Sequence, residues 1–248
     1  MAGYMYLGNK KVCPAILIGG DEKVFNVDGY QWFGEIDDNG VLSVPKQDIE
    51  LVFDGVKNIS TNFINSLMTT NSRSRIKSVA FPDLEQITGD NALYAAFRNN
   101  PSKIVSILFQ KLRVASGTDA FINTFWYNKI PVISFPALEE TGMLCFEGTF
   151  GYGSVTTEAH FDKLKKFGEY SFASCFFRNT ALRDVYFNSV KADSFDDANG
   201  ALEGMLEDCS NVTLHFPSNV QAVIQELSDY PNFSGTNTTI LYDLEPTE

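Results

Sequence analysis

Histidine and cysteine are scarce in this chain of 248 residues, which has two His and four Cys. Cys13, Cys145, Cys175 and Cys209 lie far apart and form no C-x-x-C or C-x-x-H pair. Zinc sites and dithiol redox motifs depend on such close spacings, so the sequence predicts neither. We expect buried free thiols, because free cysteine is among the most buried residue types.

Catalytic motifs are also lacking. His160 and His215 have no carboxylate or cysteine at a motif spacing, and a general base needs a positioned partner of that kind. We therefore expect a protein that is not an enzyme, with no catalytic residues, no metal site and no cofactor.

Basic residues are fewer than acidic ones, and long apolar runs are absent from the sequence. The chain has 19 Lys and Arg against 31 Asp and Glu, a formal net charge of −12, and no basic cluster. Nucleic acid is therefore not an expected partner, since phosphate binding needs clustered cations. No stretch approaches the roughly 18 apolar residues of a membrane span. Lys10 and Lys11 interrupt the apolar start, so neither membrane insertion nor a secretory signal is expected.

Phenylalanine, by contrast, is abundant, with 21 residues. Many of them recur with Leu or Val three positions later and serve as markers of a repeat. The markers are Phe53 with Val56, Phe81 with Leu84, Phe109 with Leu112, Phe135 with Leu138, Phe161 with Leu164, Phe187 with Val190, and Phe216 with Val220 displaced by one residue. They are spaced by 28, 28, 26, 26, 26 and 29 residues. A period of this size indicates a solenoid, in which each unit buries itself against its neighbours.

Each marker follows a short run of alternating apolar residues, as in Val79 with Phe81 and Ile133 with Phe135. This period of two predicts a strand with one face inward. The unit of Phe161 is weaker, because Ala159 takes the matching position.

An apolar pair four residues apart follows each marker by ten to fifteen residues. The pairs are Phe63 and Leu67, Leu93 and Phe97, Phe121 and Phe125, Phe146 and Phe150, Phe172 and Phe176, and Leu202 and Leu206. Side chains at i and i+4 share one side of a helix, so each unit reads as strand, turn and short helix or 3₁₀ segment.

A small residue stands three places after most of these pairs. It is Asn100, Asn128, Asn179 or Cys209, with Gly153 in one unit. Asn commonly bonds nearby backbone groups, so we expect these side chains to close the turn toward the next strand rather than to bind a ligand.

The predicted fold class is an α/β repeat solenoid of about seven strand-turn-short-helix units, like a leucine-rich-repeat stack. Residues 1–45 do not fit the repeat and carry Gly-rich turn signals, which predicts a β-rich N-terminal cap or attachment element. Residues 46–228 hold the repeats, ending in a helix that starts at a Ser218 N-cap. Residues 229–248 hold Pro231, Gly235 and a capping strand around Thr239–Tyr242.

The repeat resembles the BspA-type leucine-rich repeats of bacterial surface proteins. The segment Ile76–Leu84 reads I-K-S-V-A-F-P-D-L and is followed by Tyr94–Phe97, while Phe172–Phe176 repeats the second half of the motif. The resemblance covers about residues 49–228. The family's cysteine position is kept only at Cys209, and the second and last units have irregular lengths. The resemblance implies a protein that binds a partner through its repeat surface.

The two ends suggest a particular setting. Tyr6–Val12 resembles a short N-terminal element of structural proteins from phages and prophages of gut bacteria, and Val212–Leu227 with Thr238–Leu244 resembles the closing unit of repeat proteins encoded there. These resemblances imply a virion appendage that contacts other virion proteins through its N-terminal region.

Outward strand positions, one and three residues before each marker, are where a ligand would bind. They are Glu50 and Val52, Ser78 and Ala80, Ser106 and Leu108, Val132 and Ser134, Glu158 and His160, Asp184 and Tyr186, and Thr213 and His215. Paired strands lie about 4.8 Å apart, so the last three pairs form one patch of carboxylates, imidazoles and a phenol. The alternative is a solvated sheet face, because outward strand positions are usually polar.

Trp126, Tyr127 and Tyr152 follow the predicted helix pairs, where they could stack on sugars or pack against neighbouring units. Packing is the favoured interpretation, because large aromatics dominate cores as well as interfaces.

The function expected is therefore binding or adhesion by a phage or prophage virion protein, with a protein or glycan on a host surface as partner. A leucine-rich-repeat scaffold for protein-protein interaction, in the cytoplasm or on a bacterial surface, is the alternative. Assembly into a homo-oligomer is left open.

Overall fold

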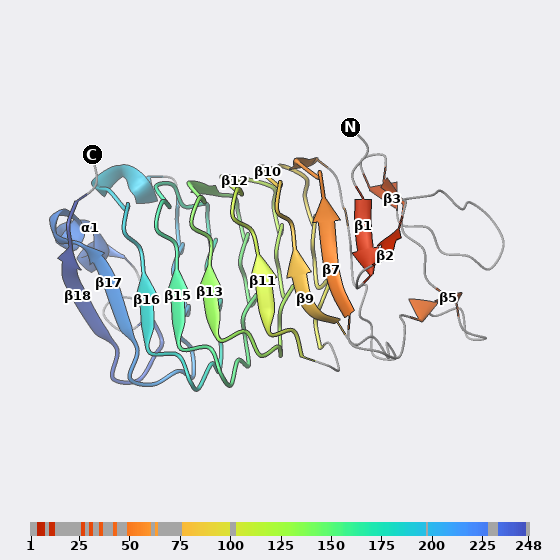
Figure 1. Ribbon diagram of the computed structural model, residues 1–248. Helices are drawn as coiled ribbons and strands as arrows, with labels where there is room; N and C mark the ends of the chain where they lie inside the picture. Colours follow the sequence, from red (N-terminus) through yellow and green to blue (C-terminus); the bar gives the residue numbers. More distant parts are fainter. Residues whose placement is uncertain are drawn as a thin grey trace.

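The computed structural model describes residues 49–60, 63, 76–99, 103–196, 198–227 and 233–246, together with the backbone of six short strands that precede them. Figure 1 shows an elongated stack of coils in which each coil repeats the path of the one before it. The chain is thus a repeat solenoid, and its coils pair through parallel strands.

One face of the solenoid carries the strands that precede or contain the marker Phe residues. They are β7 (Ile49–Asp54), β9 (Ile76–Ala80), β11 (Ser106–Leu108), β13 (Val132–Ser134), β15 (Glu158–His160), β16 (Asp184–Tyr186) and β17 (Thr213–Pro217), and β18 (Thr239–Leu244) follows them. All seven strands predicted from the markers are therefore present. They form two sheets, one ending at β11 and the other beginning at β13.

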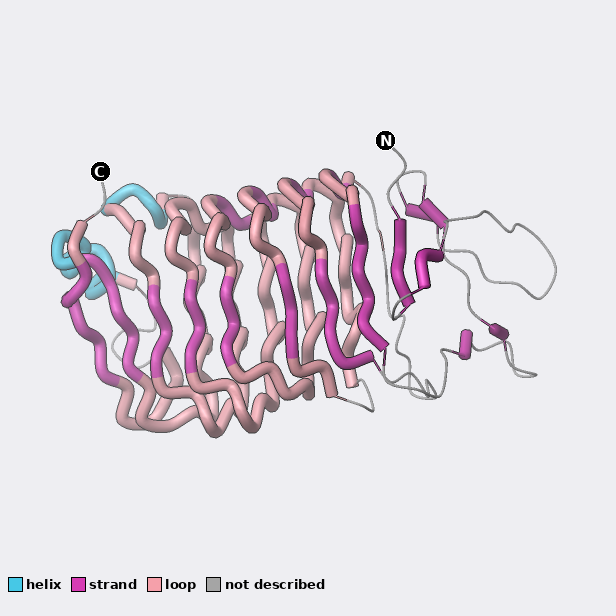
Figure 2. The backbone as a smooth tube through the Cα atoms, viewed as in Figure 1, coloured by secondary structure: helices cyan, strands magenta, loops and turns pink. Residues whose placement is uncertain are grey.

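A second side of the solenoid carries shorter parallel strands. They are β8 (Asn58–Ile59), β10 (Gln86–Ile87), β12 (Val114–Ala115) and β14 (Glu140–Thr141), and Lys166 continues the pairing as a bridge to Glu140. Figure 2 shows that turns and loops, drawn in pink, make up most of the rest of each coil.

The segments with the i to i+4 apolar pairs were predicted to be short helices, but they form runs of turns. The helix prediction was therefore wrong for the described pairs. In residues 91–99 the N–H groups of Leu93, Ala95 and Phe97 donate to Ala120, Ile122 and Thr124 in the next coil, at 2.8 to 3.0 Å. The intervening amides close local turns, as when the Ala96 N–H donates to the Leu93 carbonyl. An α-helix would instead direct every amide to a residue four positions earlier.

A left-handed residue every fourth position explains why the pairs are nevertheless four apart. In residues 91–99 these residues are Asn91, Ala95 and Asn99, with φ of 55°, 49° and 56°. The same period continues in the later coils at Asp119, Asn123 and Tyr127, at Leu144, Gly148 and Tyr152, and at Tyr170, Ser174 and Arg178. Each pair of apolar side chains therefore points inward from successive turns, without a helix.

The core consists of aromatic columns that run along the solenoid axis. The marker rings of Phe81, Phe109 and Phe135 stack at centroid distances of 5.2 and 5.3 Å, and Phe161, Phe187 and Phe216 extend the column. A second column joins the later member of each i to i+4 pair, from Phe97 through Phe125 and Phe150 to Phe176. Such offset stacks add about 0.5–1.5 kcal/mol per pair beyond the area that they bury.

The thiols of Cys145, Cys175 and Cys209 are free and buried beside these columns, as predicted; Cys13 lies outside the described residues. Burial raises the pKa of Cys209 to about 11 and raises the pKa of Cys175 well above its ordinary value. These thiols therefore stay neutral at physiological pH and contribute to packing as apolar groups.

The two ends of the solenoid differ from its middle. In the segment predicted as a β-rich cap, the described backbone consists of strands β1 (Tyr4–Leu7), β2 (Lys10–Val12), β3 (Asn26–Val27), β4 (Tyr30–Gln31), β5 (Glu35–Ile36) and β6 (Leu42–Ser43). Strand β1 pairs antiparallel with β7, the first strand of the solenoid. The remaining residues of 1–45 lie outside the described ones.

At the other end, the predicted helix is a 3₁₀ turn, η2 (Ser218–Val220), followed by α1 (Gln221–Glu226). Ser218 is the first residue of that turn, not the N-cap that the sequence predicted. The predicted capping strand is β18, and Pro231 lies outside the described residues. Within the described part of the chain, no helix is long and apolar enough to span a membrane.

Candidate functional site

The outward positions of β15, β16 and β17 come together as the sequence predicted. Glu158, Asp184 and Thr213 are register partners in one row. His160, Tyr186 and His215 are partners in the second row. Because both rows lie on hydrogen-bonded strands, the backbone fixes their relative positions.

The second row forms a continuous stack of three rings. The centroids of His160 and Tyr186 are 4.6 Å apart with an interplanar angle of 4°, and those of Tyr186 and His215 are 4.3 Å apart at 11°. The ring edges, rather than the faces, therefore point toward solvent from the middle of the stack.

Carboxylates contact the histidines at both ends of this stack. His215 lies between two of them, with its Nε2 3.1 Å from Asp184 Oδ1 and its Nδ1 3.0 Å from Asp243 Oδ2. His160 Nε2 lies 3.2 Å from Glu158 Oε2 and its Nδ1 lies 4.0 Å from Asp162. We call this set of residues the ring-stack patch: Glu158, His160, Asp162, Asp184, Tyr186, Thr213, His215 and Asp243.

Burial is uneven within the ring-stack patch. The His215 side chain is only 11% exposed, whereas the side chains of Asp184 and Asp243 are 32% and 47% exposed. Burial, together with the charges of Asp184 and Glu158, raises the pKa of the Tyr186 phenol above its ordinary value. The phenol therefore stays protonated at neutral pH and can donate a hydrogen bond.

Asp243 and Asp162 were not among the predicted site residues. Asp243 lies on β18, which was treated as a cap rather than as another repeat unit. Yet Tyr242 follows the marker Phe216 by the usual 26 residues, and Leu214 pairs with Ile240. Accepting Tyr242 as a marker would have made Leu241 the register partner of His215 and placed Asp243, two residues further on, on the same outward face.

The other outward positions form no comparable cluster. Ser78, Ala80, Leu108 and Ser134 are half-buried, and Val132 is exposed. The side chains of Glu50 and Val52 lie outside the described ones. The polar surface of this face is thus concentrated at its C-terminal half.

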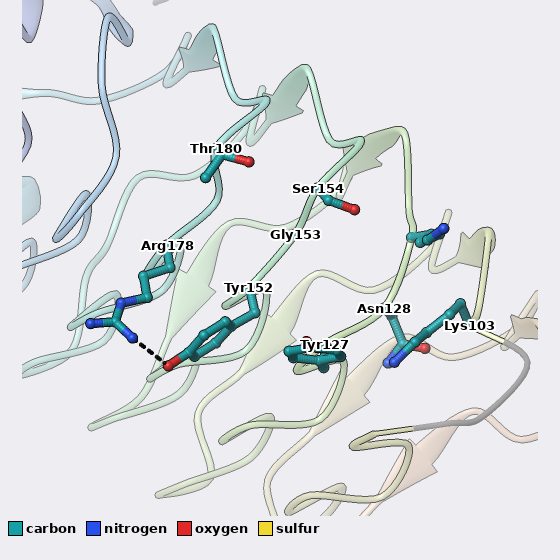
Figure 3. Close-up of a pocket in the computed structure, with 9 residues that line it drawn as sticks. Lys103, Tyr127, Asn128, Tyr152, Gly153, Ser154, Arg178 and Thr180 are labelled. Atoms are coloured by element: carbon teal, nitrogen blue, oxygen red, sulfur yellow. Dashed lines mark hydrogen bonds between the residues drawn. The ribbon is translucent and has the colours of Figure 1, made fainter.

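A cavity of about 370 Å³ opens where the runs of turns lead into the next strands. Figure 3 shows Tyr127 and Tyr152 on its floor, with Lys103 and Arg178 at either side. Ser154 and Thr180 also line it, both exposed. The sequence analysis had singled out Tyr127 and Tyr152 but not the basic residues Lys103, Lys129 and Arg178 that line the same cavity.

The large aromatics near the cavity pack against one another, as the sequence analysis favoured. Trp126 stacks on Phe177 at 5.8 Å and contacts Tyr152 at 5.0 Å, and Arg98 covers it at 5.3 Å. Tyr127, although 47% exposed, lies between Tyr152 and the Lys103 ammonium. Their ring faces are therefore largely occupied within the protein.

The small residues after the turn runs were predicted to close the turn toward the next strand, but the shortest hydrogen bonds of the Asn128 side chain go to the preceding coil, and the Asn179 amide has no partner among the described residues. Asn128 is buried, accepts a hydrogen bond from Ile104 N–H at 2.7 Å, and donates to the Phe97 carbonyl at 3.0 Å. Cys209 Sγ lies 3.0 Å from the Phe176 carbonyl in the corresponding place. Asn100 lies outside the described residues.

The fold and these two surface features define the class of protein as a parallel β-solenoid with a polar patch on its strand face and a basic cavity at a corner. Comparison with known proteins does not extend this description, because no protein-family model, curated protein or solved structure matches the chain.

Proposed function

We propose that this protein is a non-enzymatic binding protein that recognises a protein or glycan on a host surface through the ring-stack patch. The observation that carries the proposal is the stack of His160, Tyr186 and His215 on three neighbouring strands, with carboxylates beside both histidines. Rigid strands hold these groups in place before a ligand arrives, so little conformational entropy is lost on binding.

The chemistry of the patch suits a ligand rich in hydrogen-bond donors. The exposed oxygens of Asp184, Asp243 and Glu158 accept hydrogen bonds from hydroxyl or ammonium groups. The Tyr186 phenol can donate to a carbonyl or ether oxygen. Sugar hydroxyls and lysine-containing protein surfaces both offer such groups.

The biological setting is also a proposal. The resemblance to BspA-type repeats supports a surface-binding role, and the resemblance of the chain ends to phage structural proteins supports a virion appendage joined to other virion proteins through its N-terminal region. Antibody labelling of native particles under the electron microscope tests this setting. Labelled particles support it, whereas chain found only in the host cytoplasm favours the scaffold alternative.

Binding to glycan arrays and to candidate host cells tests the patch itself. We expect Asp184→Ala and Tyr186→Ala each to weaken binding at least about tenfold, because each removes a pre-positioned polar contact. Glu203→Ala and Tyr94→Ala are matched controls, since these residues lie on turn runs away from the patch. Unchanged binding in both patch variants, with thermal stability retained, would show that the ligand binds elsewhere.

A further inference from the structure

The corner cavity collects positive charge in a strongly acidic chain. Three cationic side chains line it. Lys103 and Lys129 belong to adjacent coils, and Arg178 comes from a later coil. The chain as a whole has a formal net charge of −12. The cavity is therefore a local exception to the charge of the molecule.

Two of these cations have no acidic partner within the described part of the chain. Arg178 donates from Nε to Asp208 at 2.8 Å and from its terminal nitrogen to the Tyr152 hydroxyl at 2.9 Å. Lys103 and Lys129, by contrast, form no ion pair with any described residue, and Lys103 lies over the Tyr127 ring at 4.1 Å.

Lysine and arginine side chains elsewhere on the solenoid form ion pairs with carboxylates of adjacent coils. Lys111 pairs with Asp83 in the preceding coil at 2.7 Å, Arg113 pairs with Glu139 at 3.2 Å, and Lys166 pairs with Glu140 at 3.1 Å. Each of these pairs joins adjacent coils. The cavity is instead lined by two lysines of adjacent coils, and partial burial with the nearby Lys129 charge lowers the pKa of Lys103. An anion between them would relieve this repulsion.

Most backbone N–H groups around the cavity already donate hydrogen bonds within the solenoid. The N–H groups of Tyr127, Lys129 and Tyr152 donate to Gly151, Ile104 and Phe177, and Thr180 N–H donates to Gly153. A peptide could not add here as an extra strand, because that mode needs unpaired backbone at a sheet edge. Recognition therefore rests mainly on side chains.

The groups that remain suit a small ring with hydroxyls and one negative charge. Ser154 and Thr180 offer hydroxyl groups, the exposed edge of Tyr127 offers an apolar contact, and Gly153 leaves the wall between them without a side chain. A Cβ at Gly153 would lie 2.4 Å from the Asn179 amide, so the packing of this wall requires glycine. The volume of about 370 Å³ is at the small end of ligand pockets, which suits one sugar residue rather than a longer chain.

We propose that this cavity is a binding site for a carboxylated sugar residue, whose carboxylate lies between Lys103 and Lys129 and whose hydroxyls contact Ser154 and Thr180. The site is distinct from the ring-stack patch and does not depend on the function proposed for it.

Isothermal titration calorimetry with the full-length protein tests the site, with D-glucuronate and N-acetylneuraminate as probes. D-glucose, inorganic sulfate and a tri-glutamate peptide serve as comparison ligands. We expect at least one of the sugar acids to bind more tightly than all three comparison ligands, and binding to weaken as salt rises. The double variant Lys103→Ala/Lys129→Ala should lower that affinity about tenfold or more, since it removes both ammonium contacts.

Two controls separate the site from general effects of charge. Lys163→Ala removes an exposed lysine that does not line the cavity and should leave binding unchanged. Lys129→Arg keeps the charge and should retain most of the affinity. The proposal is overturned if neither sugar acid binds, if glucose binds equally well, if sulfate or the peptide binds more tightly, or if Lys163→Ala weakens binding as much as the double variant does.

Discussion

At the scale of single residues, buried asparagines contribute to this solenoid by joining one coil to the next. Asn128 connects its own turn run with the preceding coil, because its amide accepts from Ile104 N–H and donates to the Phe97 carbonyl. Asn179 has the same position two coils later, but both polar atoms of its amide are buried without a partner among the described residues. The two residues look equivalent in sequence and differ in their bonding.

We expect Asn128→Ala to lower the free energy of unfolding by about 2 kcal/mol, because it leaves a buried N–H and a buried carbonyl unpaired. Asn179→Ala removes the same atoms but breaks no described hydrogen bond, so it should cost distinctly less. Urea unfolding followed by circular dichroism measures both. Equal losses in the two variants would mean that the Asn128 hydrogen bonds contribute little beyond packing.

At the scale of elements, the corner after the short strands brings backbones of successive coils into close contact. A Cβ at Gly117 would lie 2.2 Å from the Gly89 carbonyl oxygen, and one at Gly142 would lie 2.2 Å from the Ser116 oxygen. Gly168 stands in the same relation to Gly142. Glycine is needed here because of space, since none of these three residues has a left-handed backbone.

Gly142→Ala tests this corner. Real Cβ atoms do not approach an oxygen so closely, so the coils must move apart at a cost of about 1–3 kcal/mol. Gly204→Ala is the control, because Gly204 has a φ of 58° but the Ser174 Oγ atom would lie 3.6 Å from the new Cβ, at ordinary contact distance. Its cost should stay near 1 kcal/mol, the strain of a left-handed alanine. Thermal unfolding of the two variants compares them, and a larger loss in Gly204→Ala would contradict the spatial argument.

The elements also show where sequence patterns are informative and where they mislead. The markers from Phe53 to Phe216 predicted the inward strand positions, because alternation reports directly on which side of a strand is buried. The pair Leu93 and Phe97 predicted a helix wrongly, since a period of four also arises from successive turns with a left-handed residue at Ala95. Nothing in the propensity of alanine indicates that backbone conformation; contacts with the next coil impose it.

The two candidate sites were predictable to different degrees, because one depends on strand register and the other on turn geometry. The ring-stack patch follows from register, because residues at equal offsets from the marker become neighbours. The cavity brings together Lys103 and Lys129, which are one period apart, with Tyr152 and Arg178 from later coils. Its depth depends on turn geometry that the sequence pattern does not specify.

At the scale of the whole molecule, a solenoid is stabilised mainly by contacts between neighbouring coils, so its ends need separate protection. Strand β18 covers the open edge of β17, and Ile240 and Tyr242 pack against the core. The same strand supplies Asp243, which contacts His215. Structural capping and completion of the ring-stack patch thus depend on one segment.

Deletion of residues 237–248 tests the capping role of β18, and comparison with Asp243→Asn separates that role from the contribution of the Asp243 charge. Without β18, the edge of β17 carries unpaired backbone groups beside the buried Leu214 and Phe216, and such edges pair with other chains. We expect a lower unfolding temperature and association that increases with protein concentration, measured by differential scanning fluorimetry and multi-angle light scattering. Asp243→Asn, which keeps the strand and an oxygen that can accept a hydrogen bond from His215 Nδ1, should remain unassociated and lose only about 1 kcal/mol. If Asp243→Asn associates as the deletion does, the charge rather than the covered edge keeps the chains apart.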